Sequence, residues 1–478
     1  MVLTLLTTIY VVCALLLTVY SVGVIILLIT YLRYRHRNAT PKPVAEWPTV
    51  AVQLPIYNEM YVVERLLDSV AQLDYPREKL TIQVLDDSTD ETTAIIANKV
   101  AELQERGLNI QHVRRGTRQG YKAGALAYGL SLLEGVEMVA VLDADFAPYP
   151  DFLRRTVAPL VHDPQLGMVQ ARWGHLNSED NILTMGQSLA LDGHFVIEQT
   201  ARNRAGWLMN FNGTCGVWRV STILDAGGWQ DVTLSEDFDL SYRAQLKGWR
   251  FLYLPDVVVP GELPLHIAAY KQQQARWAKG STQCMTLLLK PIWTSNRLTL
   301  MQRIMGTIHL CQYMVHPLIV LMLILTPPLL LTGSIQRLPL GVLSFAGLGP
   351  PLVFVISQHA LYPDWWRRLL ALPALLALGT GVAWSNANAV LNGLFSRKGE
   401  FKRTPKYAAI RRDNKYALRI NRHIIWEIAL AAYALWGILL ASQLAPTFMP
   451  YLTIYMCAFG AVGFWGLRDY LALRRAAS

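Results

Sequence analysis

Apolar residues are unevenly distributed along this chain of 478 residues, and their distribution limits its possible folds more than any other feature. Residues 1–32 contain no charged side chain. At about 1.5 Å rise per residue, roughly 20 of them would cross a hydrocarbon core of about 30 Å. Long apolar stretches return only beyond residue 295. The pattern predicts a membrane protein with a soluble domain inserted between its membrane segments.

The flanks of the first apolar segment indicate its orientation. Arg33, Arg35 and Arg37 follow it, no basic residue precedes it, and no small-residue cleavage site closes it. A membrane helix therefore fits better than a cleaved signal peptide. Because basic flanks face the cytoplasm, we expect a multi-pass protein of the cell (inner) membrane whose inserted domain is cytosolic.

The second half of the chain holds further apolar segments on both sides of a basic loop. The segments are predicted at about 312–332, 341–361, 369–392, 423–441 and 448–467. Residues 397–422 contain ten Lys or Arg, which is typical of a cytoplasmic loop beside anionic lipids. Three crossings between the inserted domain and this loop would leave it outside. We therefore expect one segment not to cross, and the polar character of 369–395 favours that one.

Strand and helix patterns alternate through the inserted domain. Strands are predicted at 49–56, 80–87, 109–115 and 138–145, and helices at 58–72, 90–106 and 121–133. This alternation predicts an α/β domain with a mostly parallel sheet, whose ligands bind at the carboxyl ends of the strands. The predicted divisions are a membrane helix at 1–37, the α/β domain at 38–295, interfacial and membrane helices at 296–396, the basic loop at 397–422, and C-terminal membrane helices at 423–478.

The net charge and the cysteine content indicate which binding partners and metals to expect. The net charge of +10 resides largely in loops beside membrane segments, so membrane lipids are expected as partners and nucleic acid is not. The five cysteines are scattered without C-x-x-C spacing, which indicates neither a zinc site nor a disulfide framework.

Paired carboxylates follow two of the predicted strands. Asp86 and Asp87 end one strand, and Asp143 and Asp145 stand in "LDADF" at the end of another. Isolated ionised carboxylates are costly to bury, so such a pair needs a cation, hydrogen bonds or open water. Mg²⁺ and Mn²⁺ take one or two carboxylates together with phosphate oxygens. A solvated loop is the alternative for a lone D-x-D pair, so its context has to decide.

Further motifs provide that context. They are "QLPIYNE" at 53–59, "VLDDSTDET" at 84–92, "FNGTCGVWR" at 211–219, "TLSEDFDLSYRAQLKGW" at 233–249 and "QQQARWAKG" at 272–280. In this order and spacing the chain resembles the family 2 glycosyltransferases, which have a GT-A fold. Within them it is most similar to the membrane-embedded, processive cellulose synthases and plant cellulose synthase-like mannan and glucan synthases. The resemblance implies a Rossmann-like GT-A domain inserted between transmembrane helices.

The resemblance implies a nucleotide-sugar site. Asp87, or its neighbour Asp86, would contact the base or ribose, although a strand-end Asp can also cap the following helix. Asp145 would hold Mn²⁺ or Mg²⁺, and Asp143 would contact the metal or the nucleotide. Lys122, in "GYKAGAL", would steady the diphosphate, unless it is a solvated residue of a helix face.

The resemblance also implies a catalytic base. Asp237, in "SEDFDL", matches the Asp of the family's T-E-D element, with Ser235 in place of Thr. It would remove the proton of the acceptor hydroxyl as that oxygen attacks the anomeric carbon, which predicts inversion. Glu236 is the competing candidate for the base and otherwise lies at the acceptor.

Gln273, Arg276 and Trp277 form a Q-x-x-R-W motif. The Trp face can pack on a sugar ring, donor or acceptor, and Arg276 can pair with phosphate. A Trp anchoring a helix at the membrane surface is the alternative. His175 and His266 are given no role.

Two further groups of residues follow from the resemblance. The acceptor-binding residues are expected to be Phe211, Asn212, Gly213 and Thr214, together with Glu236 and Trp277. The segment "GEFKRTPKY" at 399–407 is similar to the gating loop of cellulose synthases, with the gating residues Phe401, Arg403, Thr404 and Lys406.

We therefore expect an inverting hexosyltransferase that takes its sugar from UDP-glucose or GDP-mannose and extends a β-linked polysaccharide processively, with translocation through the membrane helices. The alternative is a lipid glycosyltransferase that acts on ceramide or diacylglycerol. A transporter would explain the apolar segments, but it would not need these motifs on a soluble insert.

Overall fold

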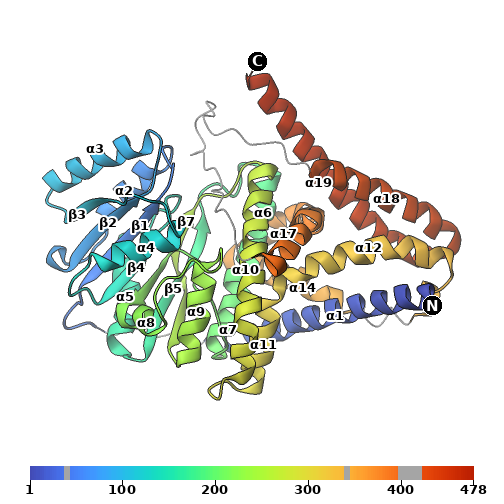
Figure 1. Ribbon diagram of the computed structural model, residues 1–478, viewed down its shortest axis with the longest axis horizontal. Helices are drawn as coiled ribbons and strands as arrows, with labels where there is room; N and C mark the ends of the chain where they lie inside the picture. Colours follow the sequence, from blue (N-terminus) through green and yellow to red (C-terminus); the bar gives the residue numbers. More distant parts are fainter. Residues whose placement is uncertain (37–42, 339–344, 397–422, 478) are drawn as a thin grey trace.

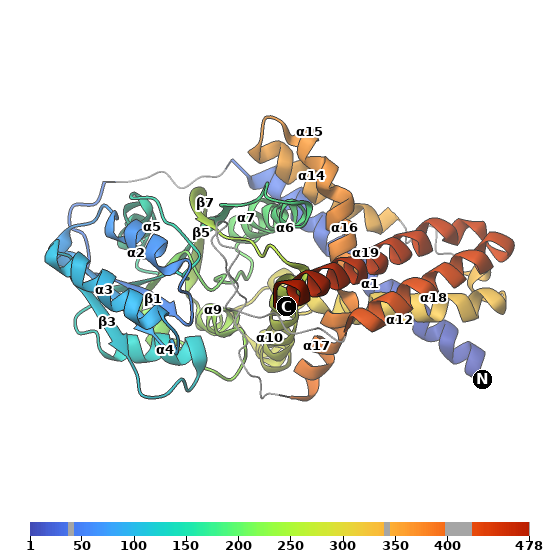
Figure 2. The same cartoon turned by 90° about the horizontal axis from the view of Figure 1, so that it is seen from above.

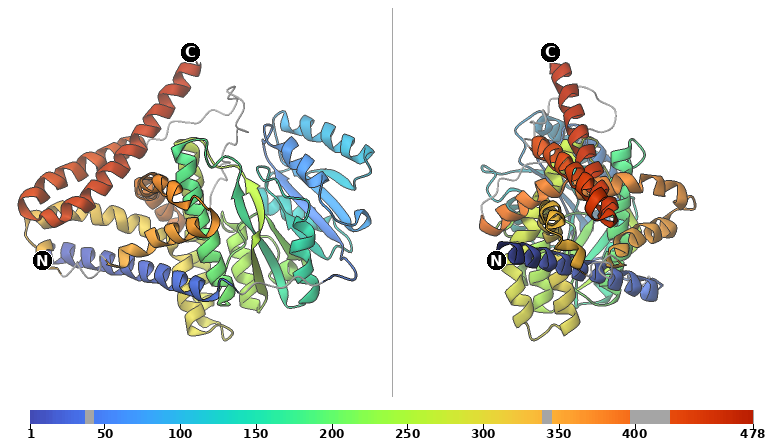
Figure 3. Two further views of the ribbon diagram at one scale, coloured as in Figure 1. Left: turned by 180° about the vertical axis from the view of Figure 1, so that it is seen from behind. Right: turned by 90° about the vertical axis from the view of Figure 1, so that its right-hand side faces the viewer.

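The computed structural model describes residues 1–36, 43–338, 345–396 and 423–477. It consists of an α/β part and a part made of long helices (Figure 1). Helix α1 (Val2–Tyr34) runs from the N-terminus, at the far end of the helical part, towards the α/β part (Figure 3). The chain therefore begins in the helical part, builds the α/β part, and then returns.

A seven-stranded sheet forms the core of the α/β part, with the order β3-β2-β1-β4-β6-β5-β7. The strands are β1 (Val50–Ile56), β2 (Leu80–Asp86), β3 (Ile110–Arg114), β4 (Met138–Val141), β5 (Leu166–His175), β6 (Gly216–Arg219) and β7 (Arg250–Gly261). Strand β1 pairs in parallel with β2 and β4, whereas β6 is antiparallel to β4 and β5. The four predicted strands are confirmed, and the insertion of β6 makes the sheet mixed.

Helices cover both faces of this sheet. The buried side chains of α2 (Val63–Ala71), α3 (Thr92–Glu105) and α5 (Phe152–His162) pack on one face. Those of α4 (Tyr121–Ser131), α8 (Val220–Asp225) and α9 (Glu236–Lys247) pack on the other. Burial on both faces explains why β1 and β2 read as nearly continuous apolar runs in the sequence. The edge at which β1, β2 and β4 end is left for a ligand.

A set of helices lies between the sheet and the helical part (Figures 1 and 2). It comprises α6 (Ile182–Asp192), the π-helix η2 (Gly193–Gln199), α7 (Thr200–Arg204), α10 (Ile267–Thr294) and α11 (Leu300–Leu310). Helix α10 passes very close to the start of α9, because a Cβ atom on Gly280 would lie 2.1 Å from the hydroxyl oxygen of Ser235. Only glycine permits this approach, which fixes α10 against the motif that contains Asp237.

Among the described residues, five helical segments are long and apolar enough to cross a membrane. They are Val2–Tyr34, Gln312–Leu331, Trp365–Phe395, His423–Leu444 and Pro446–Leu471. The helices that make up the last four are α12 (Val315–Leu331), α15 (Trp365–Arg368), α16 (Leu372–Gly381), α17 (Ala383–Phe395), α18 (His423–Leu444) and α19 (Met449–Ala477). Helices α18 and α19 lie side by side as a hairpin (Figures 1 and 3).

Two apolar stretches follow α12 in the described residues up to 396. The apolar stretch at 341–361 contains helix α14 (Gly349–Leu361), whose 13 residues span only about 20 Å. The segment Trp365–Phe395 has 31 residues and meets the length and composition needed to cross. Within it, however, α16 and α17 have 10 and 13 residues, so neither is longer than α14. That the segment at 369–395 does not cross stays a prediction.

A buried ion pair joins α10 to α18. The Nζ atom of Lys271 lies 2.7 Å from one carboxylate oxygen of Glu427 and donates a 2.8 Å hydrogen bond to the other. The two side chains are 1% and 0% exposed. At the start of α10, the backbone N–H of Ile267 donates to the carboxylate of Asp469 on α19 at 3.1 Å. These contacts tie α10 to two candidate membrane helices.

Removal of one charge of this pair should be strongly destabilising. A Lys271→Met substitution leaves Glu427 buried and unpaired, which costs about 3–5 kcal/mol of unfolding free energy. The double change Lys271→Met with Glu427→Leu should recover most of that loss. Thermal unfolding in detergent micelles measures both effects, with Lys290→Met, an exposed lysine of the same helix, as the control. Equal melting temperatures for Lys271→Met and the control would show that the pair contributes nothing.

Candidate active site

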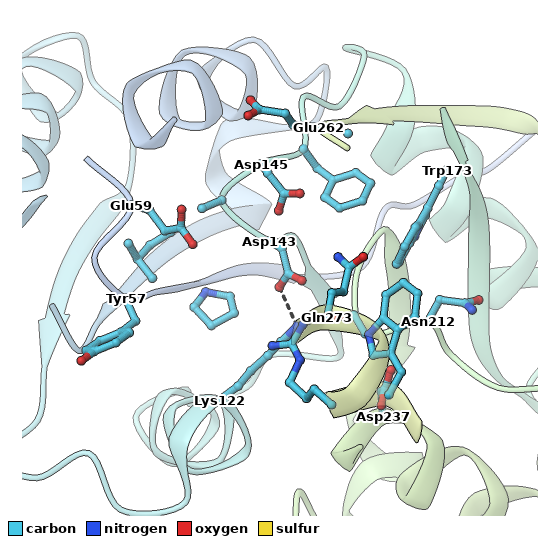
Figure 4. Close-up of a pocket in the computed structure, with 18 of the residues that line it drawn as sticks. Tyr57, Glu59, Lys122, Asp143, Asp145, Trp173, Asn212, Asp237, Glu262 and Gln273 are labelled. Carbon is cyan, nitrogen blue, oxygen red and sulfur yellow. Dashed lines mark hydrogen bonds and ion pairs between the residues drawn. The ribbon is translucent and has the colours of Figure 1, made fainter. Parts of the chain in front are cut away.

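A cavity of about 200 Å³ lies where β1, β2 and β4 end (Figure 4). Its walls come from the segments that follow β1, β2, β4 and β7, and from α4, α9 and α10. The charged residues that line it are Glu59, Asp87, Arg118, Lys122, Asp143, Asp145, Glu236, Asp237, Glu262 and Arg276. Seven carboxylates thus share this space with three basic side chains, an excess of negative charge that a bound cation would balance.

Lys122 holds the first carboxylate of the D-x-D pair. Its Nζ atom lies 2.5 Å from Oδ1 of Asp143 and donates to the carbonyl oxygen of Gly213 at 2.9 Å. Burial lowers the pKa of Lys122, but the negative charges of Asp143 and Glu236 outweigh this effect and raise the pKa. The ammonium group is therefore charged and directed into the cavity (Figure 4), and Lys122 is not a solvated residue of a helix face.

Asp145 lies on the side of the cavity that also carries Glu59 and Glu262 (Figure 4). Glu262 is held by Arg65, whose Nη2 atom is 3.1 Å from its carboxylate. Among the described residues there is no group of three or more His, Cys, Asp or Glu side chains arranged to hold a metal. Asp143 and Asp145 could therefore supply two ligands at most, and phosphate oxygens would have to supply others. Mg²⁺ and Mn²⁺ accept such mixed coordination, so the residues fit the ion.

The two neighbouring carboxylates at the end of β2 have different surroundings. Asp87 lines the cavity, and Arg115 holds it in a bidentate pair at 2.8 and 2.5 Å. Asp86 is not brought to the cavity surface. Its fully buried carboxylate accepts from the backbone N–H of Ser88 at 2.8 Å and contacts His112 at 2.9 Å. Of the two predicted nucleotide contacts, only Asp87 is in position, and Asp86 instead supports the loop.

Asp237 stands in the first turn of α9, close to Gly213. Gly213 has a φ of +82°, and a Cβ atom on it would lie 3.1 Å from Oδ2 of Asp237, so glycine leaves room for this carboxylate. Burial and the neighbouring charge of Glu236 raise the pKa of Asp237 to about 7. Burial also raises the pKa of Glu236. A carboxylate with such a pKa is suited to accept a proton near neutral pH.

The Q-x-x-R-W residues lie together on α10. Gln273, Arg276 and Trp277 all line the cavity, as expected for positions three and four apart on a helix. Burial lowers the pKa of Arg276, and the charges of Glu236 and Asp143 oppose that shift. Trp277 therefore faces the site, so anchoring at the membrane surface is not its main contact.

The expected acceptor segment divides into two pairs. Asn212 and Gly213 line the cavity, whereas Phe211 and Thr214 are fully buried behind it. The Phe211 ring packs edge-on against Trp218, with 5.6 Å between the ring centres. Thr214 accepts the backbone N–H of Asp143 through its hydroxyl at 2.9 Å. These two residues support the site and do not reach its surface.

The structure adds lining residues that the sequence did not single out. Tyr57, Arg118 and Trp173 line the cavity, and the Arg118 guanidinium carbon lies 3.4 Å from the centre of the Tyr57 ring. Tyr57 follows directly on β1, in "QLPIYNE", so its position at a strand end was an available signal. His175, which was given no role, lines the cavity and contacts Asp192 at 2.9 Å. The predicted gating residues Phe401, Arg403, Thr404 and Lys406 lie outside the described residues.

A second cavity, of about 290 Å³, adjoins the first. The residues that line both are Trp173, Leu191, Asn212, Ser235, Asp237, Gln273 and Trp277. Asp237 thus lies at the junction of two cavities, where it can contact ligands that enter from either one.

The raised pKa of Asp237 predicts how stability depends on pH. An unfolded Asp titrates at about 3.9, whereas the native carboxyl titrates at about 7. The native state binds this proton more tightly, so this carboxyl makes the unfolding free energy fall as pH rises from about 4 to about 7. An Asp237→Asn variant should therefore gain more in melting temperature at about pH 8 than at about pH 5. Thermal unfolding with EDTA measures this, with exposed Asp180→Asn as control. Equal gains at both pH values would contradict the shifted pKa.

Comparisons with known proteins agree with this geometry. Residues 48–280 match the family model described as "Glycosyltransferase like family 2". Glucomannan 4-beta-mannosyltransferase 9 of Arabidopsis thaliana is 41% identical over 261 residues, which cover 54% of this chain and 49% of that protein. Glucomannan 4-beta-mannosyltransferase 1 of Oryza sativa subsp. japonica is 42% identical over 261 residues, 54% of this chain and 50% of that protein. The chain thus spans about half the length of these curated relatives.

A solved structure shows the same fold. It is a mannosyltransferase from Pyrobaculum calidifontis in complex with GDP-Man and Mn²⁺, with a TM-score of 0.54 and 23% identity. The similarity covers 82% of this chain and 99% of that one. The predicted GT-A fold is confirmed.

Proposed function

We propose that the protein transfers a mannosyl group from GDP-mannose to a β-linked glycan, with inversion, since its residues 48–280 match the family model described as "Glycosyltransferase like family 2". The position of Asp237, between a cavity rich in carboxylates and a second cavity, carries this proposal. The relatives named as glucomannan mannosyltransferases and the structural neighbour in complex with GDP-Man support the choice of mannose.

The donor would occupy the cavity at the strand ends. Asp87 and the stacked pair of Tyr57 and Arg118 would face the nucleoside, and Lys122 and Arg276 would pair with the diphosphate. Asp143 and Asp145 would hold Mn²⁺ or Mg²⁺, which would stabilise the negative charge of the departing diphosphate.

The acceptor would enter from the second cavity. Asp237 would take the proton from the acceptor hydroxyl while its oxygen attacks the anomeric carbon and the bond to the diphosphate breaks on the opposite face. A single displacement of this kind inverts the anomeric configuration. Trp277, which lines both cavities, would pack on a sugar ring.

We further propose a multi-pass location in the cell (inner) membrane, with the α/β part in the cytosol, and processive extension with export of the chain. The second cavity reaches Gln312 and Tyr313, the first residues of a candidate membrane segment. A glycan leaving Asp237 through this cavity would therefore meet the helical part of the protein.

The size of the labelled product tests the proposal. The protein in lipid nanodiscs receives Mn²⁺ with labelled GDP-mannose or labelled UDP-glucose in separate reactions, and EDTA in a third. We expect a water-extractable, mannanase-sensitive chain from GDP-mannose alone, and none with EDTA. Label on one sugar of an organic-extractable lipid would instead assign the protein to the lipid glycosyltransferases. Asp237→Asn should lower turnover by about 10²- to 10⁴-fold and serves as the inactive control.

The pH profile tests the base. The catalytic carboxyl must be ionised, so kcat/KM should fall about tenfold per pH unit below the pKa of Asp237, which lies at about 7. The Glu236→Gln variant lacks the neighbouring negative charge, so the pKa of Asp237 falls. The fall of kcat/KM on the acid side of the pH profile (the acid limb) should therefore move to lower pH. Glu179→Gln changes an exposed carboxylate and should leave the limb in place. If the acid limb of the Glu236→Gln variant lies at the same pH as in the wild type, a group other than Asp237 causes it.

A further inference from the structure

The second cavity has the lining that sugars require. Aromatic rings of Trp173, Tyr270, Trp277 and Tyr313 face it, together with the amide groups of several Asn and Gln residues. Apolar faces of a sugar pack on aromatic rings, while its hydroxyls need polar partners. Figure 4 shows Trp173, Asn212 and Asp237 near one another at the end of the first cavity that adjoins the second.

One histidine and one carboxylate in this cavity come from the π-helix η2. His194 and Glu198 both line it, with 24% and 20% of their side chains exposed, and the Nδ1 atom of His194 lies 3.2 Å from Oε2 of Glu198. π-Helical turns are rare and are often found at functional sites. Neither residue belongs to a motif noted in the sequence.

A directed chain of hydrogen bonds leads to Glu198. Gln199 donates through Nε2 to Oδ1 of Asn212 at 2.6 Å, so the Asn212 amide nitrogen faces Nε2 of His194, at 3.1 Å, and donates to it. Since Nε2 of His194 accepts, its proton is on Nδ1 and is donated to Oε2 of Glu198. Of the two Glu198 oxygens, the described residues engage only Oε2, which leaves Oε1 to accept from a ligand.

A second polar group in the cavity also lacks a partner. The buried Oδ1 atom of Asn210 accepts no hydrogen bond from the described residues, although Asn210 lines the cavity. A buried acceptor without a donor is costly, and a hydroxyl from a ligand would satisfy it.

We propose that Glu198, oriented by the Asn212–His194 chain, determines acceptor specificity by accepting a hydrogen bond from a hydroxyl of the acceptor sugar. This inference rests on the proposed function, since it names the residue that selects the glycan. Asn212 lines both cavities, so the same hydrogen-bond chain connects the recognised hydroxyl to the surroundings of Asp237. A site built to bond a hydroxyl strongly rejects a ligand that lacks it.

The Glu198→Gln substitution replaces the hydrogen-bond acceptor that faces the acceptor sugar with a donor, and it changes the shape of the side chain little. The His194 proton keeps the amide oxygen at its side, so an NH₂ group replaces Oε1 as the group that faces the ligand. We expect the KM for β-1,4-mannotetraose to rise at least about tenfold, while the KM for GDP-mannose changes less than about twofold. Glu179→Gln, an exposed carboxylate with 81% of its side chain accessible, is the matched control.

The measurements separate the inference from the function on which it rests. If the wild-type protein releases no GDP from GDP-mannose with acceptor present, the proposed function fails. If it does, and Glu198→Gln keeps the wild-type KM for mannotetraose, only the role of Glu198 fails. Melting temperature and slow GDP release without acceptor report folding and donor binding, and both should match wild type. Should Glu198→Gln unfold, Glu198→Asp, which keeps the charge on a shorter side chain, takes its place, with the same rise in acceptor KM expected.

Discussion

An excess of negative charge in one cavity is the constraint on which the rest of the site depends. Seven carboxylates line it with three basic side chains, and the ends of β1, β2 and β4 bring most of them together. Lys122, Arg115 and Arg65 each hold one carboxylate in place. Asp143 and Asp145 line the same cavity, and two carboxylates are the number that Mg²⁺ or Mn²⁺ takes beside phosphate oxygens. Burial, and after it the negative charge of Glu236 beside it, raise the pKa of Asp237 in the same cavity.

Residues that are neighbours in sequence line different cavities. Glu236 lines only the cavity at the strand ends, whereas Asp237 lines both. Gln273 and Trp277, one turn apart on α10, also border both cavities. The layout makes the Asp237 carboxylate part of the lining of both cavities.

The sequence predicted the parts of the fold and the site that short motifs specify. The strands β1 to β4, the D-x-D carboxylates, Asp237 and the Q-x-x-R-W face are confirmed as elements or lining residues of one cavity. Sequence did not separate Asp87 from Asp86, because adjacent residues at a strand end point to different sides of the chain. Phe211 and Thr214 lie in the loop before β6, where no regular alternation shows which side chains face the cavity. His194 and Glu198 had no motif, and only the folded π-helix brings them to Asn212.

The burial of Lys271 against Glu427 bears on how separable the two parts of the protein are. Helix α10 contributes Gln273, Arg276 and Trp277 to the cavity wall, and the charge of its Lys271 is neutralised by Glu427 on α18, a helix of the other part. A fragment that ends after α10 would expose that lysine and the apolar surface packed around it. The α/β part is therefore not a module that can be excised or exchanged between proteins intact. Changes in the helical part, including those that the thickness of a surrounding bilayer would impose, would be transmitted to α10 and so to the cavity wall.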